Sequence, residues 1–445
     1  MVKKIFDKIV KDQNNKEVFL KSALFLFFRI GGFLFGYLFT VLITQNYGKQ
    51  VFGFVTLGFT VFMIFSVVSK FGFDINFTRV VSSNRYSNEQ IKKLYFKILG
   101  ITFACSLCVS FIFIFFREWI SIQVFNKPDF SDYLYWAALA LPCWVVVFIN
   151  AGVFRGFKNN ALFSFFNSFG RFGLASIILL IYIFFSTDYS NVSPLIIHFI
   201  AVLILALLST IINIKTFSKY VNDKSEVIST KSFFKSSLPI LISSSVFILL
   251  TWIDKLFLGV YETESEIALF EVSAKIALVI GFTLEALNSI LAPKISELFY
   301  KKDVFALQNT INFTSKINIS ISIFMFLLIL SFPTQILSIF GESFKEGKTI
   351  LLILATGKLI SSLSGSVGII LQMTGNQQIY KRIMIMALFI NLTLNLILIE
   401  PYGVIGVAIA TSLTMIIWNL SAVIIIKKKL KINSFYYPLN IKNAN

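Results

Sequence analysis

The sequence predicts an all-α integral membrane protein with about twelve transmembrane helices, in two six-helix halves around a central cavity. Hydrophobic residues make up 56% of the 445 positions and the mean hydropathy is +0.81, which is too apolar for a soluble domain. Apolar runs follow one another along the chain, and the positive charge of the loops between them alternates. These observations together indicate a chain that crosses a membrane many times.

Each element is predicted from the length of one apolar run. A bilayer core about 30 Å thick is crossed by roughly 20 helical residues, at a rise of about 1.5 Å per residue. The predicted spans, in order, are 23–43, 51–71, 94–116, 134–154, 161–185, 193–214, 234–258, 267–291, 313–337, 348–371, 380–399 and 403–426.

The distribution of basic residues predicts the orientation. With the N-terminus in the cytoplasm, 29 of the 40 Lys and Arg residues fall in cytoplasmic segments and 5 in external loops. Positive charge is retained on the cytoplasmic side of membrane proteins, so both termini are expected there. The net charge of +18 is therefore assigned to topology and to membrane lipids, and no nucleic-acid partner is expected.

The polar, basic segment 215–235 is the best candidate for a linker between the halves. Short turns that follow the fourth and tenth spans carry Gly156 and Gly375 at matching places, which indicates a parallel repeat suited to alternating access. The predicted organisation is a cytoplasmic tail 1–22, a six-helix bundle 23–214, the linker 215–235, a second bundle 236–426 and a cytoplasmic tail 427–445.

Several classes of site are missing from the sequence. There is no P-loop and no metal-spaced His/Cys cluster, so neither a catalytic site nor a metal site is predicted, and the chain is not expected to be an enzyme. Cys105, Cys108 and Cys143 lie inside spans and are interpreted as ordinary thiols. His198, the only histidine, is interpreted as interfacial packing, with a proton relay as the alternative.

Charged residues inside the spans are the main candidates for function, because each costs several kcal/mol at the bilayer centre. Arg29, Arg171 and Lys358 have no obvious local partner, and Lys255 and Lys275 lie toward the outer side. One interpretation pairs each cation with polar groups of other helices. The other places them in a cationic cavity that binds a diphosphate, whose oxygens suit Arg and Lys donors.

Three acids lie within the spans: Asp254, Glu271 and Glu285. Glu271 and Lys275 are spaced i, i+4, so they are expected to pair on one helix face. Asp254 lies beside Lys255 near an interface. The three acids are candidates for coupling or gating.

Motifs in order along the chain make it resemble the polysaccharide flippases of the multidrug/oligosaccharidyl-lipid/polysaccharide exporter superfamily. The motifs are Gly72-Phe-Asp74 with Arg79, Phe154-Arg-Gly-Phe-Lys158, Asp254-Lys-Leu-Phe-Leu-Gly259, Asn288 with Ala292-Pro-Lys-Ile-Ser-Glu-Leu298, Leu371-Gln-Met-Thr-Gly375, Asn395 and Tyr402-Gly403. Relatives often have a glycine–tyrosine pair early in the eighth span, where this chain has Phe270-Glu271. The resemblance therefore assigns no role to this part of the predicted cavity.

The resemblance implies a flippase of the bacterial cytoplasmic (inner) membrane that moves undecaprenyl-diphosphate-linked oligosaccharide repeat units for O-antigen (lipopolysaccharide) or capsule synthesis. It adds Asp74 and Arg79 to the coupling or gating candidates. It implies no cofactor beyond coupling to a proton or sodium gradient. The implied partners are the lipid-linked glycan, a polysaccharide polymerase and a chain-length regulator, with the protein itself a monomer.

Three other functions compete with this one. A multidrug exporter of the same superfamily would need unpaired acids in its cavity, whereas the charge at mid-depth is positive here. The peptidoglycan lipid flippase usually has two helices more. A membrane polymerase or glycosyltransferase would need a large external loop or an acidic interfacial site, and the longest external loop is only about 117–133.

Overall fold

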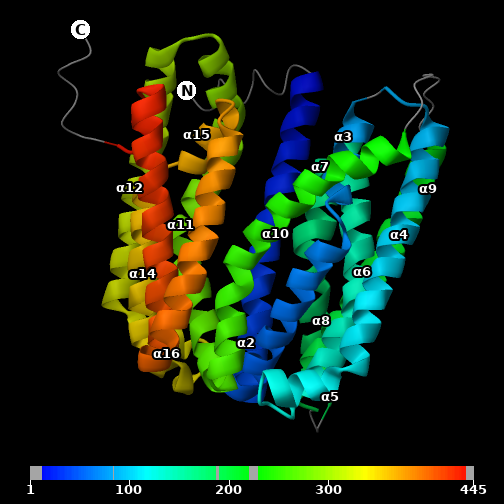
Figure 1. Ribbon diagram of the computed structural model, residues 1–445, viewed down its shortest axis with the longest axis vertical. Coiled ribbons are helices and arrows are strands. Elements are labelled where there is room, and N and C mark those ends of the chain that lie inside the picture. Colours follow the sequence, from blue (N-terminus) through cyan, green and yellow to red (C-terminus); the bar gives the residue numbers. More distant parts are fainter. Residues whose placement is uncertain (1–12, 84, 187–189, 220–228, 437–445) are drawn as a thin grey trace. The chain divides into compact units, whose positions relative to one another are not determined.

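The computed structural model describes residues 13–83, 85–186, 190–219 and 229–436, and every element in these ranges is a helix (Figure 1). The predicted all-α class is confirmed. Residues 1–12, 220–228 and 437–445, which belong to the predicted N-terminal tail, linker and C-terminal tail, lie outside the described residues.

The chain divides into two compact units, residues 1–248 and 249–445. The boundary falls inside one helix, α10 (Thr230–Tyr261), rather than in a loop. Residues 230–248 of this helix therefore belong to the first unit, and residues 249–261 to the second.

The first unit is built from long apolar helices joined by short turns (Figure 1). Its other elements are α2 (Gln13–Ser69), α3 (Phe73–Ser82), α4 (Asn88–Phe115), α5 (Arg117–Trp119), η1 (Ile120–Val124), α6 (Phe130–Gly156), α7 (Asn160–Ser164), η2 (Phe165–Phe169), α8 (Gly170–Phe185) and α9 (Ser193–Lys219). Helix α6 is the central helix: its residues are mostly buried, and it packs against α2, α3, α4 and α9.

The second unit is also built from long apolar helices joined by short turns. Besides the end of α10, it contains α11 (Glu264–Tyr300), α12 (Val304–Ser331), α13 (Pro333–Ser338), η3 (Glu342–Gly347), α14 (Lys348–Leu363), α15 (Val367–Met373) and α16 (Gln377–Leu430). Helix α14 packs against α11, α12 and α16.

Ten helices in the described part of the chain are long and apolar enough to cross a membrane. Two of them, α2 and α16, have 57 and 54 residues, and a straight helix of that length would reach about 80 Å. Each contains a glycine with non-helical dihedrals, Gly48 (φ 81°) and Gly403 (φ 56°), at or beside a predicted loop. The breaks occur where two spans are expected to meet, but the count of twelve stays a prediction.

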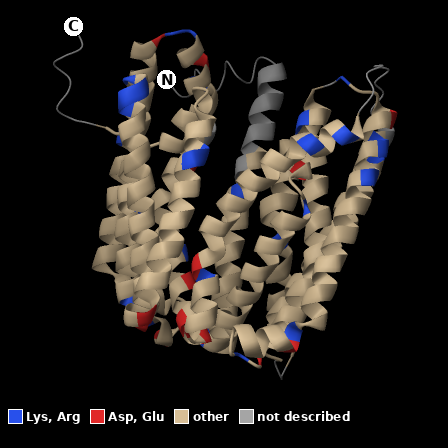
Figure 2. Ribbon diagram, in the orientation of Figure 1, with Lys and Arg blue, Asp and Glu red and all other residues tan. Residues whose placement is uncertain are grey.

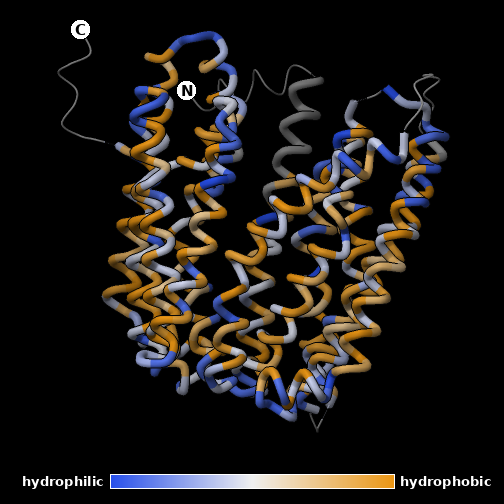
Figure 3. Tube along the Cα trace, viewed as in Figure 1, coloured by the Kyte–Doolittle hydropathy of each residue, from blue (hydrophilic) through white to orange (hydrophobic). Residues whose placement is uncertain are grey.

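The middle of each unit carries few charges, and Lys and Arg gather toward the helix ends (Figure 2). Hydrophobic residues dominate the central part of the helices (Figure 3). Many large apolar side chains on the outside are exposed, as at Phe111, Phe184 and Phe324, whereas Trp144 and Phe154 are buried in the core of the first unit. An apolar exterior around a packed apolar core is the arrangement that lipid solvation requires.

Glycine allows the closest helix contact in the first unit, so Gly152→Ala is expected to destabilise the protein by about 1–3 kcal/mol. A Cβ at Gly152, in α6, would lie 2.5 Å from the carbonyl oxygen of Asp74 in α3. Gly100→Ala, in α4, is the matched control, because nothing lies within 4 Å of its added Cβ. The melting temperatures of both variants in one detergent decide the point, and equal values would contradict the close contact.

Candidate functional site

Asp254 is a buried carboxylate near the end of α10 and is 4% exposed. Its Oδ1 accepts hydrogen bonds from Nδ2 of Asn391 (3.0 Å) and of Asn395 (2.8 Å). Its Oδ2 accepts one from Oγ1 of Thr411 (2.7 Å). All three donors are neutral, so they solvate the carboxylate without neutralising its charge.

The break in α16 brings these donors together. Asn391 and Asn395 are spaced i, i+4 and therefore share one face of the first segment of α16. Gly403, with φ of 56°, ends that segment and lets the chain turn back. A Cβ at Gly406 would lie 2.0 Å from a backbone oxygen of the first segment, so the two segments approach closely. Thr411 thereby lies beside both asparagines.

The oxygen atoms around Asp254 suit a proton or a hard cation. Asn391 Oδ1 accepts from Asn395 Nδ2 (3.1 Å), and the Thr411 hydroxyl lies 2.9 Å from the carbonyl oxygen of Val407. Oδ1 of Asn395 is buried and has no hydrogen-bond donor. Carboxylate, amide and hydroxyl oxygens are the ligands that hard cations prefer. Among the described residues there is no cluster of three or more His, Cys, Asp and Glu, so Asp254 would supply the only charge of such a site.

Lys255, the residue after Asp254, belongs to a second group of charged side chains. Its Nζ lies 2.7 Å from Oε2 of Glu271 in α11 and 3.8 Å from the centre of the Trp252 ring. Lys275 Nζ lies 3.4 Å from Oε1 of the same Glu271, which confirms the predicted i, i+4 pair. Two cations thus contact one carboxylate.

Lys358 lies on α14 where it faces α11. A Cβ at Gly281 would lie 2.6 Å from Cε of Lys358, so this lysine stem packs directly over a glycine of α11. Glu285, one turn further along α11, is the carboxylate whose charge acts on Lys358. Lys358 thus has no partner nearby in the sequence, as predicted, and the carboxylate that acts on it lies on another helix.

Arg171 is held inside the first unit by a cage of rings. Its guanidinium carbon lies 4.6 to 5.3 Å from the ring centres of four aromatic residues, and the side chain is 6% exposed. The rings belong to Phe59, Phe62, Trp144 and Phe172. Such faces attract a cation but carry no charge.

His198 is the hydrogen-bond partner of this arginine. Arg171 Nε donates to Nε2 of His198 (2.8 Å), and Nη1 lies 3.3 Å from Sδ of Met63. Arg171 therefore pairs with a polar group of another helix, which is the first of the two interpretations of the buried cations. The imidazole of His198 is fully buried. An imidazole that accepts at Nε2 is neutral and carries its hydrogen on Nδ1. No described carboxylate pairs with Arg171, and its Nη2 has no acceptor, so the positive charge is uncompensated by any described acid.

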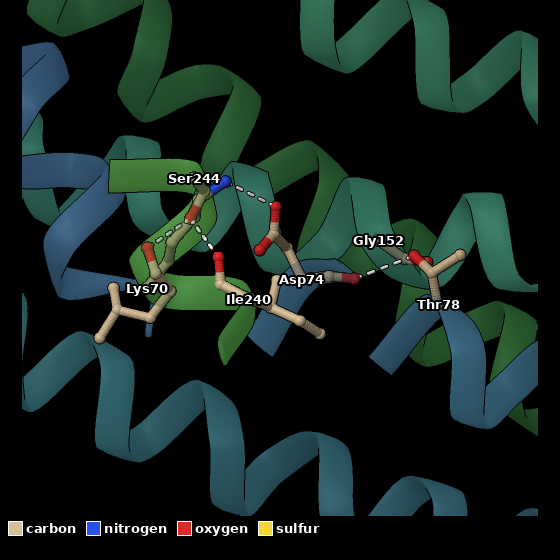
Figure 4. Close-up of polar contacts among 7 residues, drawn as sticks. Lys70, Asp74, Thr78, Gly152, Ile240 and Ser244 are labelled. Atoms are coloured by element: carbon tan, nitrogen blue, oxygen red, sulfur yellow. Dashed lines mark hydrogen bonds and ion pairs between the residues drawn. The ribbon is translucent and has the colours of Figure 1, made fainter. Parts of the chain in front are cut away.

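Asp74 fixes the turn between α2 and α3. Its Oδ2 lies 2.6 Å from Nζ of Lys70, and Oγ1 of Thr78 lies 2.9 Å from the carbonyl oxygens of both Asp74 and Gly152 (Figure 4). Gly72, with φ of 69°, provides the left-handed residue that starts α3. Asp74 therefore has a structural partner that the sequence motif does not include.

The two remaining candidates are exposed. Arg29 lies on the first segment of α2, and Arg79 lies in the last turn of α3. Arg79 lines a pocket together with residues from the start of α10. The substrate-binding, coupling and gating roles of all these residues stay predictions.

The sequence interpretation missed three residues and one hydrogen bond of the buried sites. Asn391 could have been found, because it is spaced i, i+4 from Asn395 within an apolar helix. No comparable sequence spacing indicates Thr411, Lys70 or the Arg171–His198 bond. Hydroxyl groups are common in these spans, and Lys70 resembles the other basic loop residues that set the membrane orientation.

Comparison with known proteins places the chain among membrane transport proteins. A family model described as "Polysaccharide biosynthesis protein" matches residues 19–299, and one described as MatE matches residues 239–397. The "Probable low-salt glycan biosynthesis flippase Agl15" of Haloferax volcanii is 27% identical over 185 residues. That match spans 41% of this chain and only 39% of the relative.

Solved structures share the fold. A multidrug resistance MATE family transporter of the MOP superfamily, in an inward-facing conformation, has a TM-score of 0.75 and 14% identity, over 90% of this chain and 94% of that one. The lipid II flippase MurJ, in an inward closed conformation, has a TM-score of 0.73 and 18% identity, over 92% of this chain and 87% of that one. At such identities the likeness shows the fold alone.

Proposed function

Because the chain belongs to the polysaccharide biosynthesis protein family, whose model matches residues 19–299, we propose that it is a flippase for a lipid-linked oligosaccharide. Family membership supports a transporter rather than an enzyme, and the partial match to a glycan biosynthesis flippase supports the class of substrate. The finer proposal is an undecaprenyl-diphosphate-linked repeat unit of O-antigen or capsule, moved across a bacterial inner membrane by a protein with both termini in the cytoplasm.

The sign of the buried charge is the observation that carries this proposal. Arg171 is buried, is not in an ion pair with any described carboxylate, and has no described acceptor at Nη2. Uncompensated cations are costly in a membrane protein, and an anionic substrate group nearby offsets that cost. A diphosphate provides such a group, while the polyprenyl chain stays in lipid.

Coupling to a proton or sodium gradient is proposed at Asp254. The carboxylate is surrounded by neutral oxygen-bearing side chains, and no described lysine or arginine forms an ion pair with it. Entry of a cation would neutralise Asp254 and change the bonds that join α10 to both segments of α16. Such a change links ion binding to the packing of the second unit.

Reconstitution tests the proposed function directly. Purified protein in liposomes should expose a fluorescent polyprenyl-diphosphate oligosaccharide from the inner leaflet to an external lectin or glycosidase, faster than protein-free liposomes do. A polyprenyl monophosphate without sugar and an amphipathic cation serve as alternative cargoes. Exposure of the lipid-linked glycan at the protein-free rate would contradict the proposal.

A multidrug exporter is the second candidate, because the MatE model matches residues 239–397 and Asp254 is a buried acid. The buried cation Arg171, which has no described carboxylate partner, disfavours a cationic cargo. Transport of the amphipathic cation in the same liposomes, with no movement of the glycan lipid, would favour this candidate.

A further inference from the structure

A polar pocket of about 460 Å³ opens between α3 and the start of α10 in the first unit. This volume is within the range of about 300–1,000 Å³ that is usual for small-ligand sites. Its polar lining comes from α3, the α3–α4 connection and the start of α10. The polar residues are Asn76, Arg79, Ser83, Arg85, Tyr86, Ser229, Ser232 and Ser236.

The lining is cationic and rich in donors. None of the described residues that line the pocket is acidic, and no described carboxylate forms an ion pair with Arg79 or Arg85. Both arginines are exposed, so their guanidinium groups remain available to a ligand. Two guanidinium groups beside several hydroxyl groups are suited to the non-bridging oxygens of a phosphate.

The first turn of α10 contributes a further positive field. Ser229 Oγ accepts a hydrogen bond from the backbone N–H of Ser232 (3.3 Å), and the first turn contains no acidic residue. The N-terminal end of a 32-residue helix therefore lies at the pocket with no negative side chain of its own to complement its dipole.

The floor of the pocket is rigid. Asn76 is 2% exposed, and its Nδ2 lies 2.9 Å from the carbonyl oxygen of Phe233 and within 3 Å of the Ser236 and Ser237 hydroxyls. These contacts hold α3 against α10 whether or not a ligand is present. A ligand above them would therefore meet a preformed site.

One prediction and one observation favour a lipid over a soluble anion. The segments 70–93 and 215–235, which supply most of the pocket lining, are predicted to lie at the cytoplasmic membrane surface. Ile75, one turn nearer the start of α3 on the same face as Arg79, is 45% exposed. An apolar side chain below an arginine suits an acyl chain below a phosphate, and basic pockets at this depth bind anionic lipid head groups.

We propose that this pocket binds the phosphodiester head group of an anionic phospholipid, with Arg79 and Arg85 on the phosphate oxygens. The lipid would join α3 and α4 to the first turn of α10, and would so stabilise the first unit. This site is separate from Asp254 and Arg171, so the proposal does not depend on the transported substrate.

The test compares lipid-dependent stability of the full-length protein. Wild type in phosphatidylglycerol nanodiscs should melt at a higher temperature than in phosphatidylcholine nanodiscs, because a ligand of the folded state stabilises it. The double variant Arg79→Gln, Arg85→Gln should lose most of this difference, and native mass spectrometry should show phosphatidylglycerol binding weakened roughly tenfold or more. Arg79→Lys, Arg85→Lys should retain part of both effects, because lysine keeps the charge without the guanidinium fork.

Matched controls separate the pocket from general charge. Lys92→Gln, Lys231→Gln removes two exposed charges from the same predicted face without touching the pocket lining, and should keep the full difference. Inorganic phosphate and glycerol phosphate, added to phosphatidylcholine nanodiscs, should not raise the melting temperature. Equal losses in the two glutamine double variants, or a shift by free phosphate as large as that by phosphatidylglycerol, would overturn the proposal. If the arginine-to-glutamine variant does not fold, the Arg79→Lys, Arg85→Lys variant decides. Partly weakened phosphatidylglycerol binding supports the proposal. Binding as tight as that of wild type, or no binding at all, contradicts it.

Discussion

Asp254→Asn is expected to reduce gradient-driven transport by roughly an order of magnitude while leaving membrane insertion and melting temperature nearly unchanged. The amide keeps one oxygen for Asn391 and Asn395, and its Nδ2 can donate to the Thr411 hydroxyl, which can in turn donate to Val407. The substitution therefore preserves the hydrogen bonds and removes the charge. Transport in liposomes with imposed sodium or proton gradients measures the effect.

Thr411→Ser is the matched control, because it keeps the hydroxyl that donates to Asp254 and should retain the ion dependence. Dissipating each gradient in turn identifies the coupling ion. Wild-type rates and unchanged ion dependence in Asp254→Asn would show that this carboxylate is not the coupling group.

Arg171→Met should abolish most transport without a matching loss of stability, and this is the second large effect we expect. Methionine places a shorter, flexible apolar chain in the aromatic cage, but it leaves Nε2 of the buried His198 without its donor, at about 1–3 kcal/mol. The double variant Arg171→Met, His198→Leu removes both partners and should be as stable as wild type or more so, since replacing buried charge by apolar groups is often stabilising.

The two measurements are melting temperature in detergent and glycan-lipid exposure in liposomes. A stable, well-inserted double variant that does not transport would assign the buried charge to function. A double variant that unfolds would assign it to structure instead, and one that transports normally would remove Arg171 from the proposed mechanism.

Much of the fold could be predicted from residue order alone, because hydropathy and helical length are local properties. Ten apolar helices and the Glu271–Lys275 pair follow from spacings within one segment. The oxygen cluster could not be predicted in the same way, because its bonds join Asp254 to residues 137 and 157 positions away. Its assembly depends on the direction in which α16 continues after Gly403, and a glycine in the sequence does not reveal that direction.

The partners of the buried charged residues could not be predicted from the sequence either. Counting residues along each apolar run predicts how deep a charged residue lies in the membrane, but it does not predict which side chain it contacts. Arg171 bonds to the neutral side chain of His198, and Lys358 faces Glu285 from a different helix. A search for opposite charges nearby in the sequence finds neither. Helix packing, rather than sequence distance, decides which buried charge meets which neighbour.

Helix α10 has a consequence for how the chain can be divided. A break at 220–228 would leave the second fragment with residues 230–248, which are an integral part of the first unit and bond to Asn76 through Phe233 and Ser236. The two fragments would then be neither independent domains nor simple halves. The second fragment would complete the first by donating a helix to it, so native packing itself provides the specificity for their reassembly.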